Sequence, residues 1–587
     1  MDRVKTSHRK RVVFICCVTV FLLFALIFRV SYLMLVEADF LQEKAEQLHN
    51  RERSIKAQRG IIYDRNGVPI AVNQSVTTIS VIHNQITNPE EVIKVLSEKL
   101  GLNPALVTKK VNHLVSIEII KKNVEQSIAD EIRAYNLNGI MIDEDYRRIY
   151  PFDNLASHVI GFVGGDSQGI IGLEVQYDEY LKGTNGMILT QTNARGIEIE
   201  NTAQTRQEPV SGQSLTISLD VNMQQYAEQA LEKVLISKQT NKGSIILMNP
   251  QNGEIYAMVN KPDFDLNDPF YLENSGSLSD KEQEIALNQL WRNYALNDTY
   301  EPGSTFKVVT ASAGLEDQVV SLDDHFFCPG YLVVEDRTIH CHKYGGHGSE
   351  TFLQGVQNSC NPVFMAIGER LGVDRFLYYL KQFGLNEKTG IDLPGEAVSI
   401  MHKKENIGPV ELATMSFGQS FQITPMQLIR AGAAVVNGGR LVTPHFGVNI
   451  LSNEGQITKT FEYDDSKRAI KEETSQLMAS ILESVVAVGT GRNSFIPGYE
   501  VGGKTATSEK LPRSSNKYIS SFLGFAPASN PQLMILVIVD EPQGVYYGGT
   551  VAAPVAKELF ENILPYLGIE PKLEENATAG ENASGKE

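Results

Sequence analysis

The sequence predicts an α+β protein with one membrane-spanning helix, a middle domain and a larger C-terminal domain. Three observations favour this organisation: a basic and then apolar N-terminus, strand patterns at both ends of residues 211–568, and helical patterns between those strands. A sheet that gathers strands from both ends of a segment, with helices between them in sequence, is typical of α+β domains. At 587 residues the chain is too long for one compact domain.

The N-terminus has the features of a membrane anchor. Residues 1–11 are rich in lysine and arginine, and an apolar run from Val12 to Phe28 continues more weakly to Val36. This length suffices for a spanning helix at residues 12–36. No small-residue cleavage signature follows, so we expect an uncleaved anchor rather than a signal peptide. Basic residues before the span predict a cytoplasmic N-terminus and place residues 37–587 outside.

Residues 37–210 are predicted to form an elongated N-terminal pedestal that carries no catalytic grouping. Glu37 to Lys56 is polar with helical spacing, which suggests a stalk leaving the membrane. Arg59 to Ala71 predicts two short strands around an Asn66-Gly67 turn. We interpret the pedestal as a spacer or as a docking surface.

Residues 211–568 are predicted to form the main domain, and residues 569–587 an acidic disordered tail. The net charge of −17 argues against nucleic acid as a partner. The domain's expected strands are 215–219, 243–248, 254–259, 518–525 and 533–539, and its expected terminal helices are 222–237 and 555–566.

Ser304 and Lys307 are the first candidate catalytic pair. Three residues apart in a helix, they lie on one face, with an amine beside a hydroxyl. A serine hydroxyl is a weak nucleophile until a base takes its proton, and a partly desolvated lysine can do this. Glu301-Pro302-Gly303 marks a helix start at Ser304, where free amide groups favour negative charge.

A second serine and a second lysine strengthen the pattern. Ser359 and Asn361 flank Cys360, and Lys504 lies in a predicted strand, residues 501–507, whose glycines would let a ligand come close. Taken singly, Ser304 is explained as an N-cap and each lysine as a solvated charge. The ordered set within one domain predicts an acyl-transfer site.

These runs, together with three N-terminal stretches, resemble the class B penicillin-binding proteins. The resemblance spans the chain from the anchor to about residue 567, and the additional stretches are residues 59–67, 148–151 and 172–183. It implies the penicillin-recognising serine transferase fold, an antiparallel sheet flanked by helices with a helical subdomain, on a dimerisation-type pedestal. It also implies a bacterial D,D-transpeptidase that cross-links peptidoglycan stem peptides outside the cytoplasmic membrane and is acylated by β-lactams.

The resemblance also implies residue roles. Ser304 would attack the D-Ala-D-Ala carbonyl, Lys307 would be the general base, Ser359 would relay a proton to the leaving group, and Asn361 would bind the substrate backbone. Lys504 would help to bind the terminal carboxylate and keep the local field positive.

Three residues on the same predicted strand complete the expected substrate site. Thr505 would assist Lys504, and the backbone amides of Ser304 and Thr507 would form the oxyanion hole. Ala506 departs from the glycine usual in the family, and its methyl group could change the fit of β-lactams.

Partners and rival functions follow from the same resemblance. No cofactor is required, and the expected partners are stem peptides, β-lactams, the membrane, a polytopic glycan polymerase and a morphogenetic complex for division, elongation or sporulation. Two alternatives are a catalytically weak β-lactam-binding scaffold or sensor, and a carboxypeptidase or β-lactamase-type hydrolase. The sequence shows neither a sensor's output domain nor a recognisable base for deacylating water.

The external cysteines raise a separate question. Cys328, Cys341, His347 and Cys360 supply three thiols and one imidazole within 33 residues, a ligand set of structural zinc. A Cys328–Cys341 disulfide is the competing interpretation for an exported protein, with Cys360 merely buried.

Overall fold

The computed structural model describes residues 2–41, 50–115, 117–191 and 205–572. The chain forms two compact units whose segments alternate along the sequence. Unit 1 comprises residues 1–58, 74–147 and 183–211, and unit 2 comprises residues 59–73, 148–182 and 212–587. Residues 59–73 and 148–182, which belong to the predicted pedestal, are therefore part of unit 2. The domain boundary predicted near residue 210 stays a prediction.

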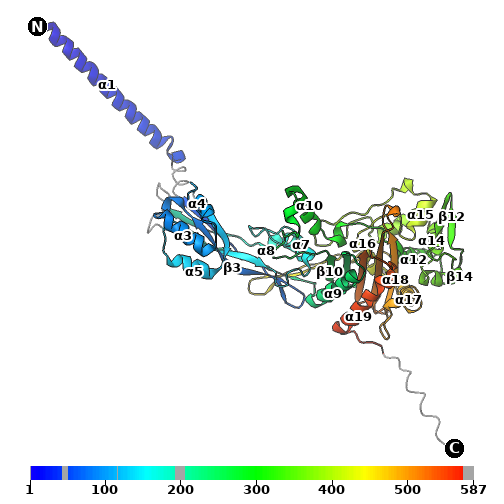
Figure 1. The fold of residues 1–587 in the computed structure, drawn as a ribbon. Helices are drawn as coiled ribbons and strands as arrows, with labels where there is room; N and C mark the ends of the chain where they lie inside the picture. Colours follow the sequence, from blue (N-terminus) through cyan, green and yellow to red (C-terminus); the bar gives the residue numbers. More distant parts are fainter. Residues whose placement is uncertain (1, 42–49, 116, 192–204, 573–587) are drawn as a thin grey trace, which may run out of the picture. The chain divides into compact units, whose positions relative to one another are not determined.

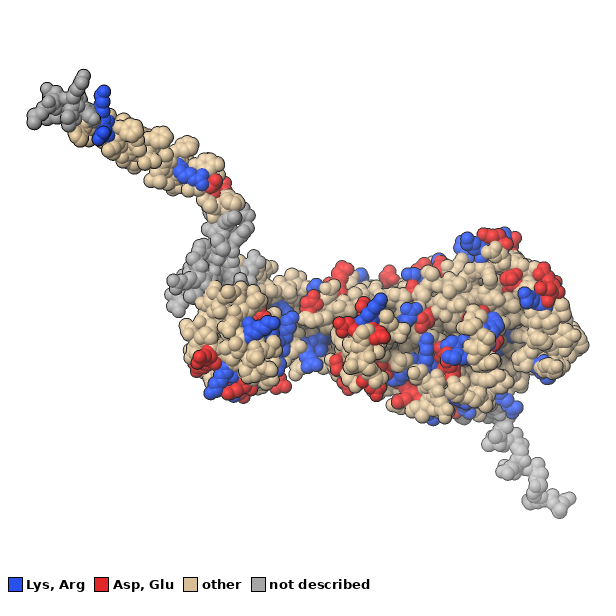
Figure 2. All heavy atoms as spheres, turned by 45° about the horizontal axis from the view of Figure 1, so that its top comes forward, with Lys and Arg blue, Asp and Glu red and all other residues tan. Residues whose placement is uncertain are grey.

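Unit 1 begins with α1 (Asp2–Leu35), which contains a span, His8–Leu35, long and apolar enough to cross a membrane. On the face drawn in Figure 2, acidic and basic side chains are interspersed over the body, whereas much of α1 carries neither. The predicted helical stalk is wrong at its C-terminal end: residues 50–55 form strand β1, because they pair antiparallel with β6 (Gly186–Gln191). Residues 42–49 of that prediction lie outside the described part of the chain.

The rest of unit 1 packs strands against helices around its own core of Val, Leu and Ile side chains. The strands β4 and β5 both pair with β3 (Pro69–Val81), which begins in unit 2. The other elements are β4 (Glu118–Val124), β5 (Ile140–Ile149), β7 (Thr205–Gln207), α3 (Pro89–Leu100), α4 (Pro104–Val111) and α5 (Gln126–Ala134).

Unit 2 is built on a five-stranded antiparallel sheet of order β10-β9-β19-β18-β17. Its strands and the helices α9 and α19 confirm elements predicted at both ends of this domain, and Figure 1 labels β10, α9 and α19. The strand predicted at 215–219 is present as β8 (Ser214–Ile217) but belongs to a different sheet. Bounds are β9 (Lys242–Met248), β10 (Ile255–Lys261), β17 (Gly502–Glu509), β18 (Tyr518–Ala526), β19 (Leu533–Asp540), α9 (Val221–Ser237) and α19 (Ala553–Tyr566).

The central strand β19 explains why this sheet is buried on both faces. All eight of its residues are buried. Because side chains alternate along a strand, Ile535 and Val537 pack with α9 and α19, whereas Leu536 and Ile538 face the larger core with the helical subdomain. That subdomain contains α12 (Lys307–Glu316), α13 (Phe352–Gln357), α14 (Asn361–Gln382), α15 (Pro409–Met415), α16 (Pro425–Val436) and α17 (Glu472–Ala487).

Smaller elements complete unit 2. The predicted hairpin around Asn66-Gly67 is present, with β2 paired to β3 and, in parallel, to β8. The remaining strands are β2 (Ile62–Tyr63), β8 (Ser214–Ile217), β11 (His325–Cys328), β12 (Tyr331–Val334), β13 (Arg337–His340), β14 (Gly348–Thr351), β15 (Gly447–Leu451) and β16 (Ile457–Thr460). The remaining helices are α6 (Ser157–Ile160), α7 (Gly172–Gln176), α8 (Asp178–Leu181), α10 (Asp280–Leu290), α11 (Tyr294–Asn297) and α18 (Gly548–Val551). Most of the predicted disordered tail, residues 573–587, lies outside the described residues.

Candidate active site

Ser304 lies in a short 3₁₀ turn, η3 (Gly303–Thr305), directly before α12, which confirms the predicted helix start. The turn is held tightly: Gly303 has a φ of 57°, and a β-carbon on it would lie 2.3 Å from Ser508 Oγ of β17. The Ser304 side chain is half-buried, and its hydroxyl makes no hydrogen bond within the described part of the chain. It is therefore free to face a substrate.

Lys307, in the first turn of α12, is almost completely buried. Its Nζ donates to the Ser359 carbonyl and to Asn361 Oδ1, both at 2.7 Å, and to Ser359 Oγ at 3.2 Å. Burial lowers the pKa of Lys307 to about 8, against the opposing influence of Cys341, Cys360 and Glu350. An amine with a pKa near 8 is partly neutral at physiological pH and can accept a proton.

The loop between α13 and α14 presents Ser359 and Asn361 to this amine. Ser359 has a backbone φ of 54°, which is uncommon for residues other than glycine. Such backbone strain often occurs at functional sites. Asn361 begins α14, where Pro362 fits the first turn, and its Nδ2 donates to the His340 carbonyl at 3.0 Å. The amide of Asn361 thus has both a donor and an acceptor bond that fix its orientation.

Lys504 reaches the same serine from β17. Its buried Nζ donates to Ser359 Oγ at 2.9 Å and to the Thr505 carbonyl at 3.0 Å. Burial, and then the charge of Lys307, lower the pKa of Lys504 well below its ordinary value. This differs from the expectation that Lys504 carries the positive charge: among the described residues it has no acidic partner, and a substrate carboxylate would supply one.

The strand β17 differs from the sequence interpretation in one detail. Gly502 and Gly503 make room for Phe525 and Phe522 rather than for a ligand, since β-carbons there would lie about 2.5 Å from the ring atoms. Further along, the Ala506 methyl lies 3.6 Å from the position that a Gly303 β-carbon would take. The methyl group therefore occupies space beside the turn that carries Ser304.

Thr505 and Thr507 lie on the same strand at the edge of the sheet. Thr505 is buried, and Thr507 Oγ1 accepts a hydrogen bond from the Gly548 amide at 3.0 Å. Because β17 pairs only with β18 within this sheet, its other edge can pair with an extended peptide. The strand also contacts η3, so Ser304 and this edge are neighbours.

Two family models match the chain. The penicillin binding protein transpeptidase domain matches residues 243–561, and the penicillin-binding protein dimerisation domain matches residues 54–217. The chain belongs to the class B penicillin-binding proteins.

Similar proteins cover almost the whole chain of this class B penicillin-binding protein. Stage V sporulation protein D of Bacillus subtilis is 39% identical, over 96% of this chain and 87% of the relative. Peptidoglycan D,D-transpeptidase FtsI of Escherichia coli is 28% identical, over 94% of this chain and 91% of the relative.

Solved structures share the fold. A peptidoglycan synthetase from Bifidobacterium adolescentis has a TM-score of 0.72 at 22% identity, covering 90% of this chain and 98% of that one. Penicillin binding protein 2X from Streptococcus thermophilus has a TM-score of 0.72 at 20% identity, covering 88% and 81%. The predicted penicillin-recognising fold is confirmed.

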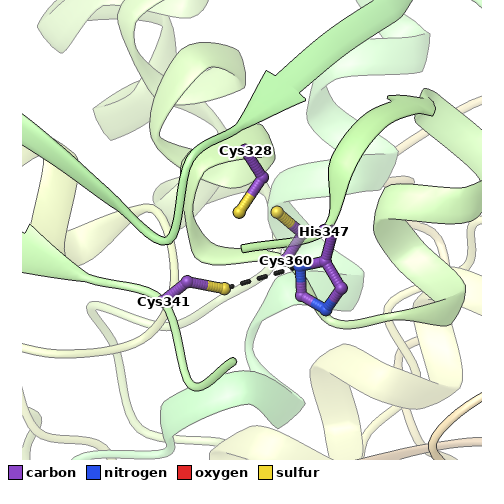
Figure 3. Close-up of side chains that lie close together, drawn as sticks. All are labelled: Cys328, Cys341, His347 and Cys360. Atoms are coloured by element: carbon purple, nitrogen blue, oxygen red, sulfur yellow. Dashed lines mark hydrogen bonds between the residues drawn. The ribbon is translucent and has the colours of Figure 1, made fainter. Parts of the chain in front are cut away.

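Three cysteines and a histidine gather next to the catalytic loop (Figure 3). The ligand atoms of Cys328, Cys341, His347 and Cys360 all lie within 4.8 Å of one another, and all five cysteines of the chain are free thiols. A hydrogen bond from Cys360 lowers the pKa of the Cys341 thiol. Three thiols and one imidazole are a donor set that fits a structural zinc ion.

Glu350 is a buried neighbour of this cluster that sequence reasoning missed. Its Oε1 has no hydrogen-bond partner and lies 3.9 Å from His347 Nδ1. An unpaired buried carboxylate oxygen is costly unless a cation or a donor satisfies it. Its place beside the cluster depends on the pairing of β14 with β11, which no local pattern in the sequence indicates.

Proposed function

We propose that this protein is a membrane-anchored D,D-transpeptidase that uses Ser304 as its nucleophile. Enzyme class follows from family membership, and several relatives are named peptidoglycan D,D-transpeptidases. The convergence of two buried lysines on Ser359 Oγ, beside the Ser304 turn, carries the assignment of residues. This arrangement supplies a base, a proton relay and a carboxylate-binding amine within one site.

In the first step, Ser304 Oγ attacks the carbonyl of the penultimate D-alanine. The new ester bond forms as the C–N bond to the terminal D-alanine breaks, and Lys307 takes the serine proton. Ser359, hydrogen-bonded to Lys307 and Lys504, passes a proton to the leaving amine. Amide groups at the start of α12 and on the β17 edge would stabilise the oxyanion, a contribution of about 3 kcal/mol per donor.

In the second step, an amine from a neighbouring stem peptide attacks the ester. A new peptide bond forms, the Ser304–acyl bond breaks, and the proton lost by the amine returns to the serine oxygen through the same groups. Asn361, held by Lys307 and the His340 carbonyl, is positioned to hydrogen-bond the peptide backbone. Thr505 would assist Lys504 in binding the terminal carboxylate during donor recognition.

A fluorescent penicillin tests these roles. We expect the label to map to Ser304, to disappear in Ser304→Ala and to fall strongly in Lys307→Ala, while the exposed control Lys281→Ala keeps it. Labelling that survives Ser304→Ala would refute the nucleophile. A label released rapidly by water would instead favour the hydrolase.

We further propose that Cys328, Cys341, His347 and Cys360 hold a structural zinc ion. The ion would stiffen the loop that carries Ser359 and Asn361, because Cys360 lies between them. No step of the acyl transfer passes through the metal.

Metal analysis of the purified full-length protein tests the zinc proposal. We expect about one zinc per chain, lost in Cys341→Ser and His347→Ala but kept in His342→Ala, although His342 Nδ1 also lies 3.8 Å from Cys341 Sγ. A zinc-free protein whose mass shows one Cys328–Cys341 disulfide would refute the proposal.

Orientation and partners complete the proposal. Basic residues at the start of α1, before its apolar run, favour a cytoplasmic N-terminus, which would place the residues after α1 outside the cell membrane. A polytopic glycan polymerase and a morphogenetic complex are the partners that the family suggests for the region around residues 54–217. The test is an enzyme reporter, of a kind that is active only outside the cytoplasmic membrane, fused after Lys572. Activity of this reporter would support the orientation, and an inactive reporter would contradict it.

A further inference from the structure

The hairpin β12–β13 presents an exposed apolar face beside the catalytic loop. The register pairs Tyr331 with His340 and Val333 with Thr338, so these four side chains share one face. We call these four residues, together with Tyr344, the hairpin face. Tyr331 is 46% exposed, Val333 63% and Tyr344 94%, whereas Leu332, Val334 and Ile339 on the opposite face pack against the core.

The backbone of Tyr344 lies beside the start of this hairpin. The Tyr344 carbonyl lies against Gly330, where a β-carbon would approach it to 2.4 Å, and Gly330 directly precedes Tyr331. The rings of Tyr331 and His340 have centroids 6.1 Å apart. An exposed group of aromatic side chains such as this marks an interaction site more often than chance exposure does.

The hairpin face is continuous with the active site. The carbonyl of His340, the last residue of β13, accepts the hydrogen bond from Asn361 Nδ2 that orients the catalytic loop. From His340 to Arg337 the strand extends about 10 Å away from that contact, at about 3.4 Å per residue. The hairpin face therefore begins at His340, next to Asn361.

The side chains of the hairpin face are suited to binding an uncharged polymer. The substrate carries such a polymer, its glycan strand. Each stem peptide is attached to a glycan strand, and a stem of about four residues spans about 13 Å when extended. The glycan must therefore pass at that order of distance from the reacting carbonyl. Aromatic rings stack on the C–H faces of sugars, and hydroxyl and imidazole groups bond to sugar hydroxyls, whereas the face itself carries no carboxylate or ammonium group.

We propose that the hairpin face binds the glycan strand to which a stem peptide is attached. The inference rests on the transpeptidase function and adds to it a sugar subsite formed by Tyr331, Val333 and Tyr344. Such a site would favour polymeric substrate over free peptides without taking part in bond formation.

The test compares glycan binding with acylation in the full-length protein in detergent micelles. The probe is an uncharged glycan, oligomers of β-1,4-linked N-acetylglucosamine, in an affinity assay. We expect Tyr331→Ala/Tyr344→Ala to weaken glycan binding about tenfold or more, since both aromatic stacking surfaces are removed. The matched control is Phe270→Ala/Tyr271→Ala, which removes aromatic side chains that are 59% and 66% exposed elsewhere.

Labelling of Ser304 by fluorescent penicillin reports on the transpeptidase site independently of glycan binding. The double variant should label like the wild type, which also reports that it is folded. Wild-type protein that labels but does not bind glycan, or a double variant that binds it as well as wild type, would overturn the sugar subsite and leave the transpeptidase intact. Loss of a protein partner with unchanged glycan binding would assign the face to that partner and likewise overturn the proposal.

Discussion

At the scale of single residues, the two site lysines have different electrostatic settings. Both are buried, but Lys307 has Cys341, Cys360 and Glu350 near it to offset burial, whereas Lys504 meets only the charge of Lys307. Lys504 therefore loses its proton more readily in the free enzyme. A substrate carboxylate next to Lys504 would restore its charge, which couples donor binding to the field at Ser304.

The pKa of Lys307, about 8, predicts the pH dependence of acylation. Lys307 acts as a base only when neutral, so the rate constant for acylation of Ser304 should rise about tenfold per pH unit at pH 6 to 7 and level off above about 8. Stopped-flow or quenched labelling with a fluorescent penicillin measures this profile. A rate that is flat from pH 6 to 9 would contradict Lys307 as the base.

Ala506→Gly tests the extra methyl beside the nucleophile. Removing it opens space between β17 and the Ser304 turn, so acylation by β-lactams with bulky side chains should rise relative to benzylpenicillin, by up to about tenfold. The free energy of unfolding should fall by about 1 kcal/mol, because glycine is costly in a strand and the side chain is buried. Equal acylation ratios for wild type and variant would show that this methyl does not limit access.

Sequence reasoning found the reactive residues but not their hydrogen-bond partners. The spacing of Ser304 and Lys307 is local and could be read directly, whereas the bonds from Lys307 to Ser359 and Asn361 join residues more than 50 positions apart. Contacts of this kind depend on how α12, α14 and β17 pack. The position of Glu350 beside His347 depends on the β11–β14 pairing for the same reason.

At the scale of elements, three stretches that carried only the resemblance to the family contribute side chains to one buried network of ion pairs. They are residues 59–67, 148–151 and 172–183. Glu174 of α7 accepts from Arg59 Nε at 2.6 Å and from Arg148 Nε at 2.7 Å, and all three side chains are at most 3% exposed. Arg148 also donates to the Gly60 carbonyl, which ties β5's end to the strand segment before β2. The network explains why these distant stretches occur together in the sequence.

Glu174→Gln should destabilise unit 2 by about 3 kcal/mol, because buried Arg148 loses its carboxylate partner while Arg59 keeps its ion pair with Asp178. Thermal unfolding of the purified protein measures this loss. The control Glu179→Gln changes an exposed carboxylate that makes no ion pair among the described residues, and it should leave the melting temperature within about a degree. Similar melting temperatures for both variants would contradict the structural role of the network.

The elements that could be predicted are those with strong local periodicity. The strands of the main sheet and helices α9 and α19 were found because their apolar runs are long and bounded by turns. The stalk prediction failed at β1, since its polar residues carry no strand signal and the strand exists only through pairing with β6, more than 130 residues away. The short strands β11 to β14 were also missed, although β12 and β13 form a local hairpin in which Val334 pairs with Arg337.

At the scale of the whole molecule, each of the two compact units is assembled from separate stretches of the sequence, whereas sequence reasoning divides the chain at a single boundary. Residues 59–73 and 148–182 leave the pedestal segment and join the C-terminal unit. No local pattern marks these crossings, because they depend on long-range contacts such as those of Glu174. The α1 helix, in contrast, could be predicted from local composition alone. Its expected role is to hold the protein at the membrane.

Removal of residues 1–36 should therefore change where the protein is found but not its chemistry. The apolar side chains of α1 from Val12 to Phe28 are exposed, so the helix adds little to either core, and the truncated protein should be soluble. Its labelling by fluorescent penicillin should stay within about twofold of the intact protein. A variant that carries an unrelated apolar helix in place of residues 12–36 should return to the membrane fraction. A truncated protein that stays in the salt-washed membrane pellet would show that other surfaces anchor it, and a soluble one that no longer labels would show that α1 supports the fold of the active site.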